Sequence, residues 1–338
     1  MSPPSLFLLA CLIASASSLP LASRDRDFAL RHTKGGKSAA DAAAAGGQRR
    51  WGGEKSDKIP PELPGAERSD DLRERVRKAT DGCVNVFVDA GANIGVHTRF
   101  LFEPAKYPES QFTKLFSNAF GAASNESAQL TCSLGFEPNP KHIKRHKALQ
   151  RAYKRMGWQY SFFHFALGVN TSEELVFYEN IESNGGNGAQ NEYWAFSTTR
   201  LEKQNQSKVR VPSVSFDTVL AQIGKRRLPA DQRHPRVLVK MDIEGSEYAV
   251  LPQVMMTGSL CRVVDYISLE WHASFAPMRF RPNQHLGLST QAEAKKMASL
   301  LKAAMADGAH AGGCLTSVAE VDDETYLHDG VPFPVPYP

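Results

Sequence analysis

The sequence lacks most of the features that would assign it to a membrane, a zinc site or a nucleic acid. Beyond its first residues, no segment approaches the ~20 consecutive apolar residues of a membrane-spanning helix. None of its five cysteines lies in a Cys-x-x-Cys or Cys/His pattern with zinc-ligand spacing. The net charge is +4 over 338 residues, so the composition requires neither a nucleic acid nor an anionic membrane as a partner. We therefore expect no transmembrane span once a leader is removed, and the substrate class has to come from motifs.

The N-terminus is typical of a secretory leader. A short apolar run from Leu6 to Ala14 precedes small residues, and Ala14-Ser15-Ala16 offers a cleavage site of the A-x-A type. We interpret residues 1–16 as a signal peptide, which predicts a lumenal or extracellular protein. No Lys or Arg precedes the run, and a cut near Ala22 fits as well. A plastid-type leader and an uncleaved anchor stay open as alternatives.

The remaining cysteines and the glycosylation sequons agree with a secretory compartment. Loss of Cys11 with the leader leaves an even number of cysteines, for which three pairings exist. They are Cys83, Cys132, Cys261 and Cys314. Asn-x-Ser/Thr sequons lie at Asn125, Asn170 and Asn205. In the secretory pathway these asparagines would accept glycans.

Residues 17–70 differ in composition from the rest of the chain. They mix Ala and Gly runs, scattered charges and a proline cluster, with no apolar periodicity that could bury a core. We interpret them as a flexible linker. The folded domain is expected over residues 71–338, beginning with a short charged helix over Asp71–Lys78.

Within that domain, short apolar runs alternate with longer amphipathic ones, which predicts an α/β fold with a mostly parallel sheet flanked by helices. Strands are expected over Val84–Asp89, Ser133–Glu137, Tyr160–Ala166, Val237–Asp242 and Val263–Glu270. Helices are expected over Ile94–Phe102, Pro140–Met156, Phe216–Ile223, Ser246–Met256 and Gln291–Ala306. The Gly/Asn-rich stretch Ser183–Gly188 is too polar for a core, so it is a candidate lid. The basic residues of 140–156 alternate with apolar ones at helical spacing and indicate a solvated helix face rather than a nucleic-acid site.

The strand positions also favour one disulfide. Cys83 and Cys132 each fall at the amino end of a predicted strand, and those strands are neighbours in the expected sheet. Adjacent strands lie ~4.8 Å apart, within the Cα separation of about 4.4–6.8 Å that a disulfide accepts. We predict a Cys83–Cys132 bond, which leaves Cys261 and Cys314 to pair by elimination.

Two strand ends carry the signature of a nucleoside site. The strand that ends at Asp89 runs directly into a turn containing Gly91, where a missing Cβ lets a ligand approach the backbone. Glu137 ends the next strand, where an acid accepts hydrogen bonds from ribose hydroxyls. Asn93 and Val96 occupy the positions where a G-x-G-x-x-G fingerprint has its second and third glycines, which disfavours an NAD(P)-dependent oxidoreductase.

In their order and spacing, these runs resemble the FkbM methyltransferases. The resemblance rests on Val88–Gly95, Phe136–Pro140, Ala166–Gly168, Ser215–Leu220, Val239–Glu247 and Ile267–Glu270. It implies a Rossmann-like class I methyltransferase fold, S-adenosyl-L-methionine as cofactor, and methyl transfer to a hydroxyl of a glycan or small-molecule acceptor. It places the methionine moiety against Asp89, Gly91 and Asn93 in the turn that ends at Gly95. The same resemblance places the ribose at Glu137 and the adenine at Ala166 and Leu167.

The candidate catalytic residues follow two other strands. Asp242 comes after Val237–Met241, while Glu270 and His272 end the last strand, so all three should meet at the sheet edge that holds the cofactor. A neutral imidazole near pH 7 would suit His272 as the general base, with Glu270 orienting it. In one alternative Asp242 and Glu244 merely cap the following helix. In another, Asp242, Glu270 and His272 bind a divalent cation, although our preferred interpretation contains no metal.

Two functions of other classes remain open at this point. The chain could be a non-catalytic secreted binding protein that keeps the fold, although acids at both strand ends argue against this. It could also be an NAD(P)-dependent oxidoreductase. Titration with S-adenosylmethionine or with dinucleotides distinguishes the three functions, because a ligand at 100 times its dissociation constant stabilises a protein by ~2.7 kcal/mol.

Overall fold

The computed structural model describes the chain from Ser69 onward, with internal gaps. The described residues are 69–171, 174–180, 196–198, 206–230, 234–276, 288, 290–310, 314, 316–321, 323 and 329–335. The expected signal peptide, the linker as far as residue 68 and the candidate lid Ser183–Gly188 lie outside them.

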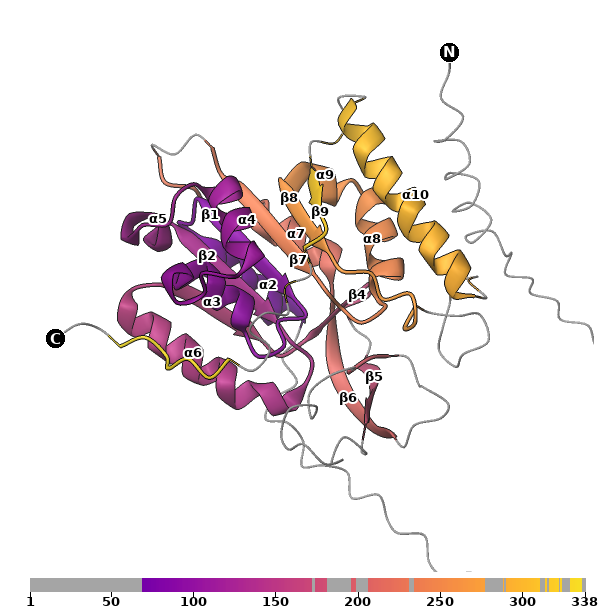
Figure 1. Ribbon diagram of the computed structural model, residues 1–338, viewed down its shortest axis with the longest axis horizontal. Coiled ribbons are helices and arrows are strands. Elements are labelled where there is room, and N and C mark those ends of the chain that lie inside the picture. The colour runs from indigo at the N-terminus through magenta and orange to yellow at the C-terminus, as the bar shows by residue number, and fades with distance from the viewer. Residues whose placement is uncertain are drawn as a thin grey trace, which may run out of the picture.

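A six-stranded sheet with the order β3-β2-β1-β7-β8-β9 forms the centre of the molecule (Figure 1). Every neighbouring pair in it is parallel. Its strands are β1 Asn85–Ala90, β2 Thr131–Phe136, β3 Gln159–Phe163, β7 Arg236–Met241, β8 Tyr266–Leu269 and β9 Ser317–Ala319. Helices cover both faces, as expected for parallel strands that are apolar throughout. The α/β class is thereby confirmed.

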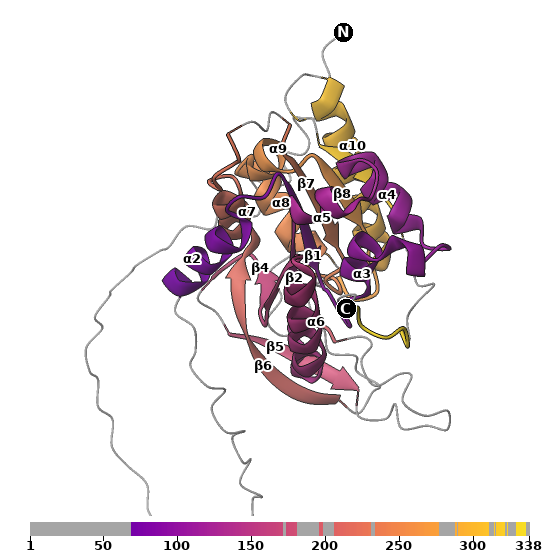
Figure 2. The same cartoon turned by 90° about the vertical axis from the view of Figure 1, so that its left-hand side faces the viewer.

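The helices form two layers (Figure 2). One face is covered by α2 Ser69–Thr80, α7 Phe216–Ile223, α8 Glu247–Met256, α9 Ser259–Val263 and α10 Gln291–His310. The other face is covered by α3 Val96–Phe102 and α4 Gln111–Phe120, with the short α5 Asn125–Gln129 beside β2 and α6 Ile143–Met156 packed on β3. Short 3₁₀ turns at Pro104–Lys106 and Pro140–His142 lead out of α3 and into α6.

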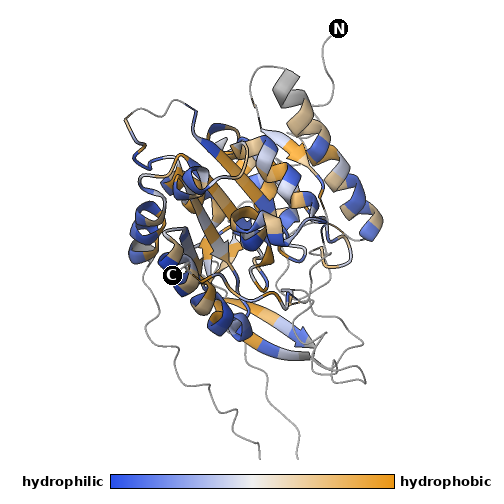
Figure 3. Cartoon of the chain, turned by 60° about the vertical axis from the view of Figure 1, so that its left-hand side comes forward, coloured by the Kyte–Doolittle hydropathy of each residue, from blue (hydrophilic) through white to orange (hydrophobic). Residues whose placement is uncertain are grey.

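The alternation of side chains along β1 builds both cores. Val86 and Val88 point into the core under α2, α7 and α8, whereas Phe87 points into the core under α3 and α4, together with Leu238 of β7. Figure 3 shows the apolar residues concentrated on these central strands. Because the side-chain period of a strand is two, Asp89 lies on the same face as Phe87. Its partner across the β1–β7 pair is Lys240.

A second, three-stranded sheet has the order β4-β6-β5 and is seen below the first in Figure 1. Its strands are β4 Ala166–Gly168, β5 Glu174–Asn180 and β6 Gln206–Ser215. The expected strand Tyr160–Ala166 was wrong as a single element, because it divides into β3 of the large sheet and β4 of the small one. The expected strand Val263–Glu270 was too long, since Val263 ends α9 and β8 begins only at Tyr266.

Both expected cysteine pairs are present as disulfides. Cys83 pairs with Cys132 at a Cα–Cα distance of 5.8 Å, and Cys261 pairs with Cys314 at 4.7 Å. The first joins the segment before β1 to β2, and the second joins α9 to the segment before β9. None of the helices in the described part of the chain combines the length and apolarity needed to cross a membrane.

Candidate active site

The turn between β1 and α3 is shaped by backbone that only small residues tolerate. Gly91 has φ 80°, and a Cβ there would lie 1.7 Å from the carbonyl oxygen of Asp242. Asn93 also has a left-handed φ of 45°, and Gly95, with φ 82°, begins α3. The absence of a side chain at Gly91 thus lets this turn contact the loop that follows β7.

Glu137 holds the turn in place from the end of β2. Its Oε2 accepts a hydrogen bond of 2.7 Å from the backbone N–H of Asn93, and its Oε1 accepts one of 2.7 Å from that of Asn139. Burial raises the pKa of this carboxyl to about 8, and the two backbone donors counteract part of that rise. Each carboxylate oxygen retains a second lone pair. Glu137 can therefore brace the turn and still accept hydrogen bonds from a ligand.

A cleft opens beside this turn and unites residues from six segments. It is lined by Gly91, Asn93, Phe136, Glu137, Pro138, His142, Ala166, Leu167, Phe177, Phe196, Asp242, Ile243, Glu244 and Ser246. Gly91, Asn93, Glu137, Ala166 and Leu167 thus meet in one place, as the sequence predicted of a cofactor site. Asp242 lines the cleft as well. The aromatic and aliphatic wall next to Glu137 matches the usual make-up of ligand pockets, which combine apolar walls with a few polar groups.

Two of the expected cofactor residues do not line the cleft. Gly95 packs against His146 and shapes the start of α3. Asp89 is 0% exposed, and within the described residues neither of its carboxylate oxygens has a hydrogen-bond partner. Burial raises the pKa of Asp89 to about 7. Asp89 therefore does not line the cleft, and its contact with the cofactor stays a prediction.

Lys240 connects this buried acid to the second group of candidates. Its Nζ donates to Asp242 Oδ2 at 2.7 Å and to the carbonyl oxygen of Gly91 at 3.2 Å. Burial alone would lower the pKa of Lys240, but the carboxylates of Asp242 and Asp89 outweigh burial and hold the pKa above its usual value. A permanent positive charge therefore lies under the cleft and fixes the orientation of Asp242.

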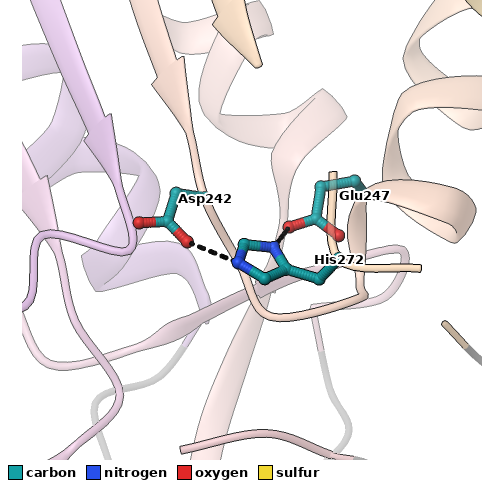
Figure 4. Close-up of side chains that lie close together, drawn as sticks. All are labelled: Asp242, Glu247 and His272. Carbon is teal, nitrogen blue, oxygen red and sulfur yellow. Dashed lines mark hydrogen bonds and ion pairs between the residues drawn. The ribbon is translucent and has the colours of Figure 1, made fainter. Parts of the chain in front are cut away.

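The catalytic candidates converge at the carboxyl ends of β7 and β8, where His272 lies between Asp242 and Glu247 (Figure 4). His272 Nδ1 is 3.1 Å from Glu247 Oε1. On the other side of the ring, Nε2 is 3.1 Å from Glu270 Oε1, 3.6 Å from Asp242 Oδ1 and 3.9 Å from Glu244 Oε2. We call these five residues the acid–histidine cluster.

The sequence predicted Asp242, Glu270 and His272 as site residues, whereas Glu244 was considered only in the alternative of a helix cap and Glu247 was not predicted as a site residue. Glu247 does bond the start of α8, because its Oε1 accepts from the backbone N–H of Ile243 at 2.8 Å. The same oxygen also faces His272. Glu244 has a left-handed φ of 52° and lines the cleft. The pattern of acids at positions 242, 244 and 247 was visible, but only the fold shows that it closes around His272.

The imidazole is not the neutral group expected from the sequence. Burial opposes its charge, but hydrogen bonds to Glu247 and Glu270 raise the pKa of His272 to about 11. Both ring nitrogens face carboxylate oxygens, so both act as N–H donors. His272 is therefore an imidazolium that holds the acids together, and the carboxylates are the groups able to accept a proton.

Comparison with known proteins agrees with the motifs. The model of the FkbM methyltransferase domain matches residues 89–303, which is more than half of the chain. No curated protein and no solved structure gives a significant match. The matched region contains the cleft and the whole acid–histidine cluster, and the chain belongs to the FkbM methyltransferase family.

Proposed function

We propose that this methyltransferase moves a methyl group from S-adenosylmethionine to a hydroxyl oxygen of a glycan or small molecule. The supporting observation is the position of the cleft. Gly91, Asn93 and Glu137 line it at the β1 and β2 ends, and Asp242 and Glu244 line it at the β7 end. A methyl donor bound at the β1 and β2 end of the cleft would lie next to carboxylates that can take up a proton.

The residues present suit the cofactor. Glu137 offers free lone pairs for the ribose hydroxyls, and Ala166 and Leu167 offer a small apolar surface for the adenine. Asn93 and Gly91 expose backbone at the turn where the methionine moiety would lie. Once bound, S-adenosylmethionine supplies an electrophilic methyl group: the S–CH₃ bond breaks with its electron pair left on sulfur while an O–CH₃ bond forms.

The acceptor hydroxyl has to lose its proton in this reaction, and we assign that proton to Asp242. Asp242 belongs to the acid–histidine cluster and also lines the cleft, while Lys240 holds its Oδ2 at 2.7 Å. His272 positions its other oxygen, since His272 Nε2 is 3.6 Å from Asp242 Oδ1, and Glu270 Oε1 in turn lies 3.1 Å from the same ring nitrogen. In this arrangement His272 is a positioning residue rather than the base.

We also propose that the protein works in the secretory pathway. The signal-peptide interpretation of residues 1–16 predicts this, and two disulfides agree with an oxidising compartment. Asn125 and Asn170 of two sequons are exposed, so glycans could be attached there without disturbing the core.

Calorimetric titration with S-adenosylhomocysteine tests the cofactor assignment. The parent should bind it, whereas Glu137→Ala, which removes the acid that lines the cleft, should lose detectable binding. Unchanged affinity in Glu137→Ala would refute the cofactor site. Binding of NAD(P) in place of S-adenosylhomocysteine would favour an oxidoreductase instead.

Transfer of a labelled methyl group to a panel of glycans and small hydroxyl compounds tests the reaction. Asp242→Asn should cut turnover by about 10²–10⁴ while S-adenosylhomocysteine still binds. Turnover within a few-fold of the parent would show that another group takes the proton.

A further inference from the structure

We propose that the acid–histidine cluster binds one divalent cation, Mg²⁺ or Mn²⁺, through His272 Nε2 and the carboxylates of Asp242, Glu244 and Glu270. The site itself is argued from the geometry of these side chains. What the cation contributes to catalysis rests on the proposed function, because it would act on the hydroxyl acceptor of the methyl transfer.

The spacing of the candidate ligand atoms fits one ion. From Nε2 the carboxylate oxygens lie at 3.1, 3.6 and 3.9 Å. Two ligands at ~2.1 Å from an octahedral ion are about 3.0 Å apart when they are adjacent. All three carboxylates therefore reach the same ring nitrogen, and side-chain rotation would bring their oxygens together around a cation.

Glu247 supports the ring from the opposite side. Its Oε1 lies 3.1 Å from His272 Nδ1. A metal-bound histidine almost always donates its other N–H to a carboxylate or carbonyl, which fixes the ring and directs the free nitrogen at the metal. In this cluster that arrangement directs Nε2 toward Asp242, Glu244 and Glu270.

A second observation indicates that the cluster is incomplete without a positive ligand. Glu247 is 0% exposed, yet its Oε2 has no hydrogen-bond partner among the described residues. A carboxylate atom of Glu247 also lies within 4.8 Å of ligand atoms of Asp242 and His272. The cluster as a whole holds four carboxylates, and among the described residues only His272 and Lys240 form ion pairs with them. Since a buried carboxylate is costly unless it is paired or lies near a cation, the cluster has capacity for further positive charge.

The backbone holds the ligands in a fixed frame. Asp242 and Glu244 follow β7 and Glu270 follows β8, and Met241 and Leu269 are paired neighbours across these two strands. The N–H of Glu270 donates to the carbonyl oxygen of Met241 at 3.0 Å. The ligands therefore come from two strand ends whose separation the sheet itself sets.

The donor atoms select the kind of ion. Carboxylate oxygens suit Mg²⁺, Ca²⁺ and Mn²⁺, and one imidazole beside several carboxylates favours Mn²⁺ or Mg²⁺ over thiolate-preferring metals. Binding requires a neutral ring, so the Nε2 proton passes to solvent when the ion enters. Since Asp242 and Glu244 also line the cleft, the ion would lie beside the acceptor. A hydroxyl bound to it would lose its proton more readily.

Titration of the full, chelator-treated chain with Mn²⁺ tests the site. Electron paramagnetic resonance and calorimetry measure the binding. We expect one saturable site, displaced by excess Mg²⁺. Glu270→Gln should weaken Mn²⁺ binding more than tenfold, and Glu247→Gln should weaken it about 10–100-fold by freeing the ring. Glu174→Gln, which changes an exposed carboxylate on β5, is the matched control and should bind like the parent.

The outcomes separate this proposal from the proposed function. Lack of saturable Mn²⁺ binding by the parent, or equal affinity of Glu270→Gln and Glu174→Gln, would overturn the cation site even if S-adenosylhomocysteine still binds. Saturable Mn²⁺ binding that Glu270→Gln abolishes would support the site even if no hydroxyl acceptor is methylated. Thermal melting of each variant shows whether it is folded, and the parent titration decides the question if a variant is not.

Discussion

Asp89 is a carboxyl group whose surroundings favour its neutral form. It is fully buried on the α3 side of β1, and burial raises its pKa from 3.8 to about 7 despite the nearby Lys240. A carboxyl whose pKa is higher in the folded than in the unfolded state binds more protons when folded. Its contribution to stability therefore falls as the pH rises from about 4 to about 7.

Asp89→Asn should make the ligand-free protein more stable in mildly alkaline solution. At pH 8 the variant should gain at least about 1 kcal/mol in free energy of unfolding, because one unit of pKa shift corresponds to ~1.4 kcal/mol. At pH 4 the gain should vanish. Urea denaturation at the two pH values measures the difference, and Asp71→Asn, an exposed position on α2, is the control. A gain independent of pH would contradict the assigned pKa.

Gly91 is required by a close backbone approach, and substitution tests that directly. Gly91→Ala should destabilise the protein by about 1–3 kcal/mol more than Gly82→Ala, because only Gly91 adds the cost of overpacking. Gly82 has a similar φ of 84°, but no described atom lies within 4 Å of a Cβ there. Both variants share the strain of a left-handed residue, ~1–2 kcal/mol. Equal losses in urea denaturation would mean that the loop after β7 yields to the methyl group.

Site residues that directly follow a strand could be located from the sequence. Site residues whose position depends on the path of the chain after the strand could not. Gly91, Glu137 and Asp242 each follow an apolar run directly, so the parallel sheet brings them together. Glu247 is the first residue of α8, and its proximity to His272 depends on the direction in which α8 runs from the end of β7. The charge of His272 was predicted wrongly for the same reason, since it depends on carboxylates that only the fold assembles.

At the scale of elements, helices with a clear apolar period were easier to predict than strands with mixed faces. The bounds of α7 were predicted as found, Phe216–Ile223. Strands β5 and β6 were missed because the predicted strands were continuous apolar runs; the alternation over Lys208–Val211 in β6 is itself typical of a half-exposed strand. The run Tyr160–Ala166 contains neither glycine nor proline, so no turn residue marked the point where the chain passes from one sheet to the other.

The disulfide between Cys261 and Cys314 ties α9 to the segment before the edge strand β9. It closes a loop with a sequence separation of 53 residues. The double variant Cys261→Ser/Cys314→Ser should lose about 2–4 kcal/mol of free energy of unfolding. Urea denaturation of variant and parent measures the loss, and the parent treated with reductant should approach the variant. A parent whose stability does not respond to reductant would indicate that the cysteines are not bonded in solution.

Across the whole molecule, the C-terminal segment closes the α3 face of the sheet. Asp329 accepts hydrogen bonds from the guanidinium groups of Arg99 and Arg145, each at 2.6 Å, and from the hydroxyl of Tyr107 at 2.9 Å. Asp323 accepts from the hydroxyl of Ser110 at 2.6 Å, at the start of α4. These contacts join segments far apart along the chain. Asp323 and Asp329 lie beyond residue 303, where the family match ends. The family motifs therefore did not predict these contacts.

Asp329→Ala tests whether this closure stabilises the fold. Arg99 has a side chain that is 0% exposed, and loss of one partner leaves its buried charge less compensated. Breaking a buried pair from one side costs about 3–5 kcal/mol, and we expect the lower end because Glu103 still bonds Arg99 at 2.8 Å. The control is Glu320→Gln, which removes the partly exposed pair with Lys302 and should cost no more than about 1 kcal/mol. Urea denaturation of both variants provides the comparison. If their losses are equal, the carboxylate of Asp329 does not stabilise the fold, and Arg99 is compensated by Glu103 and the backbone carbonyls of residues 331 and 332.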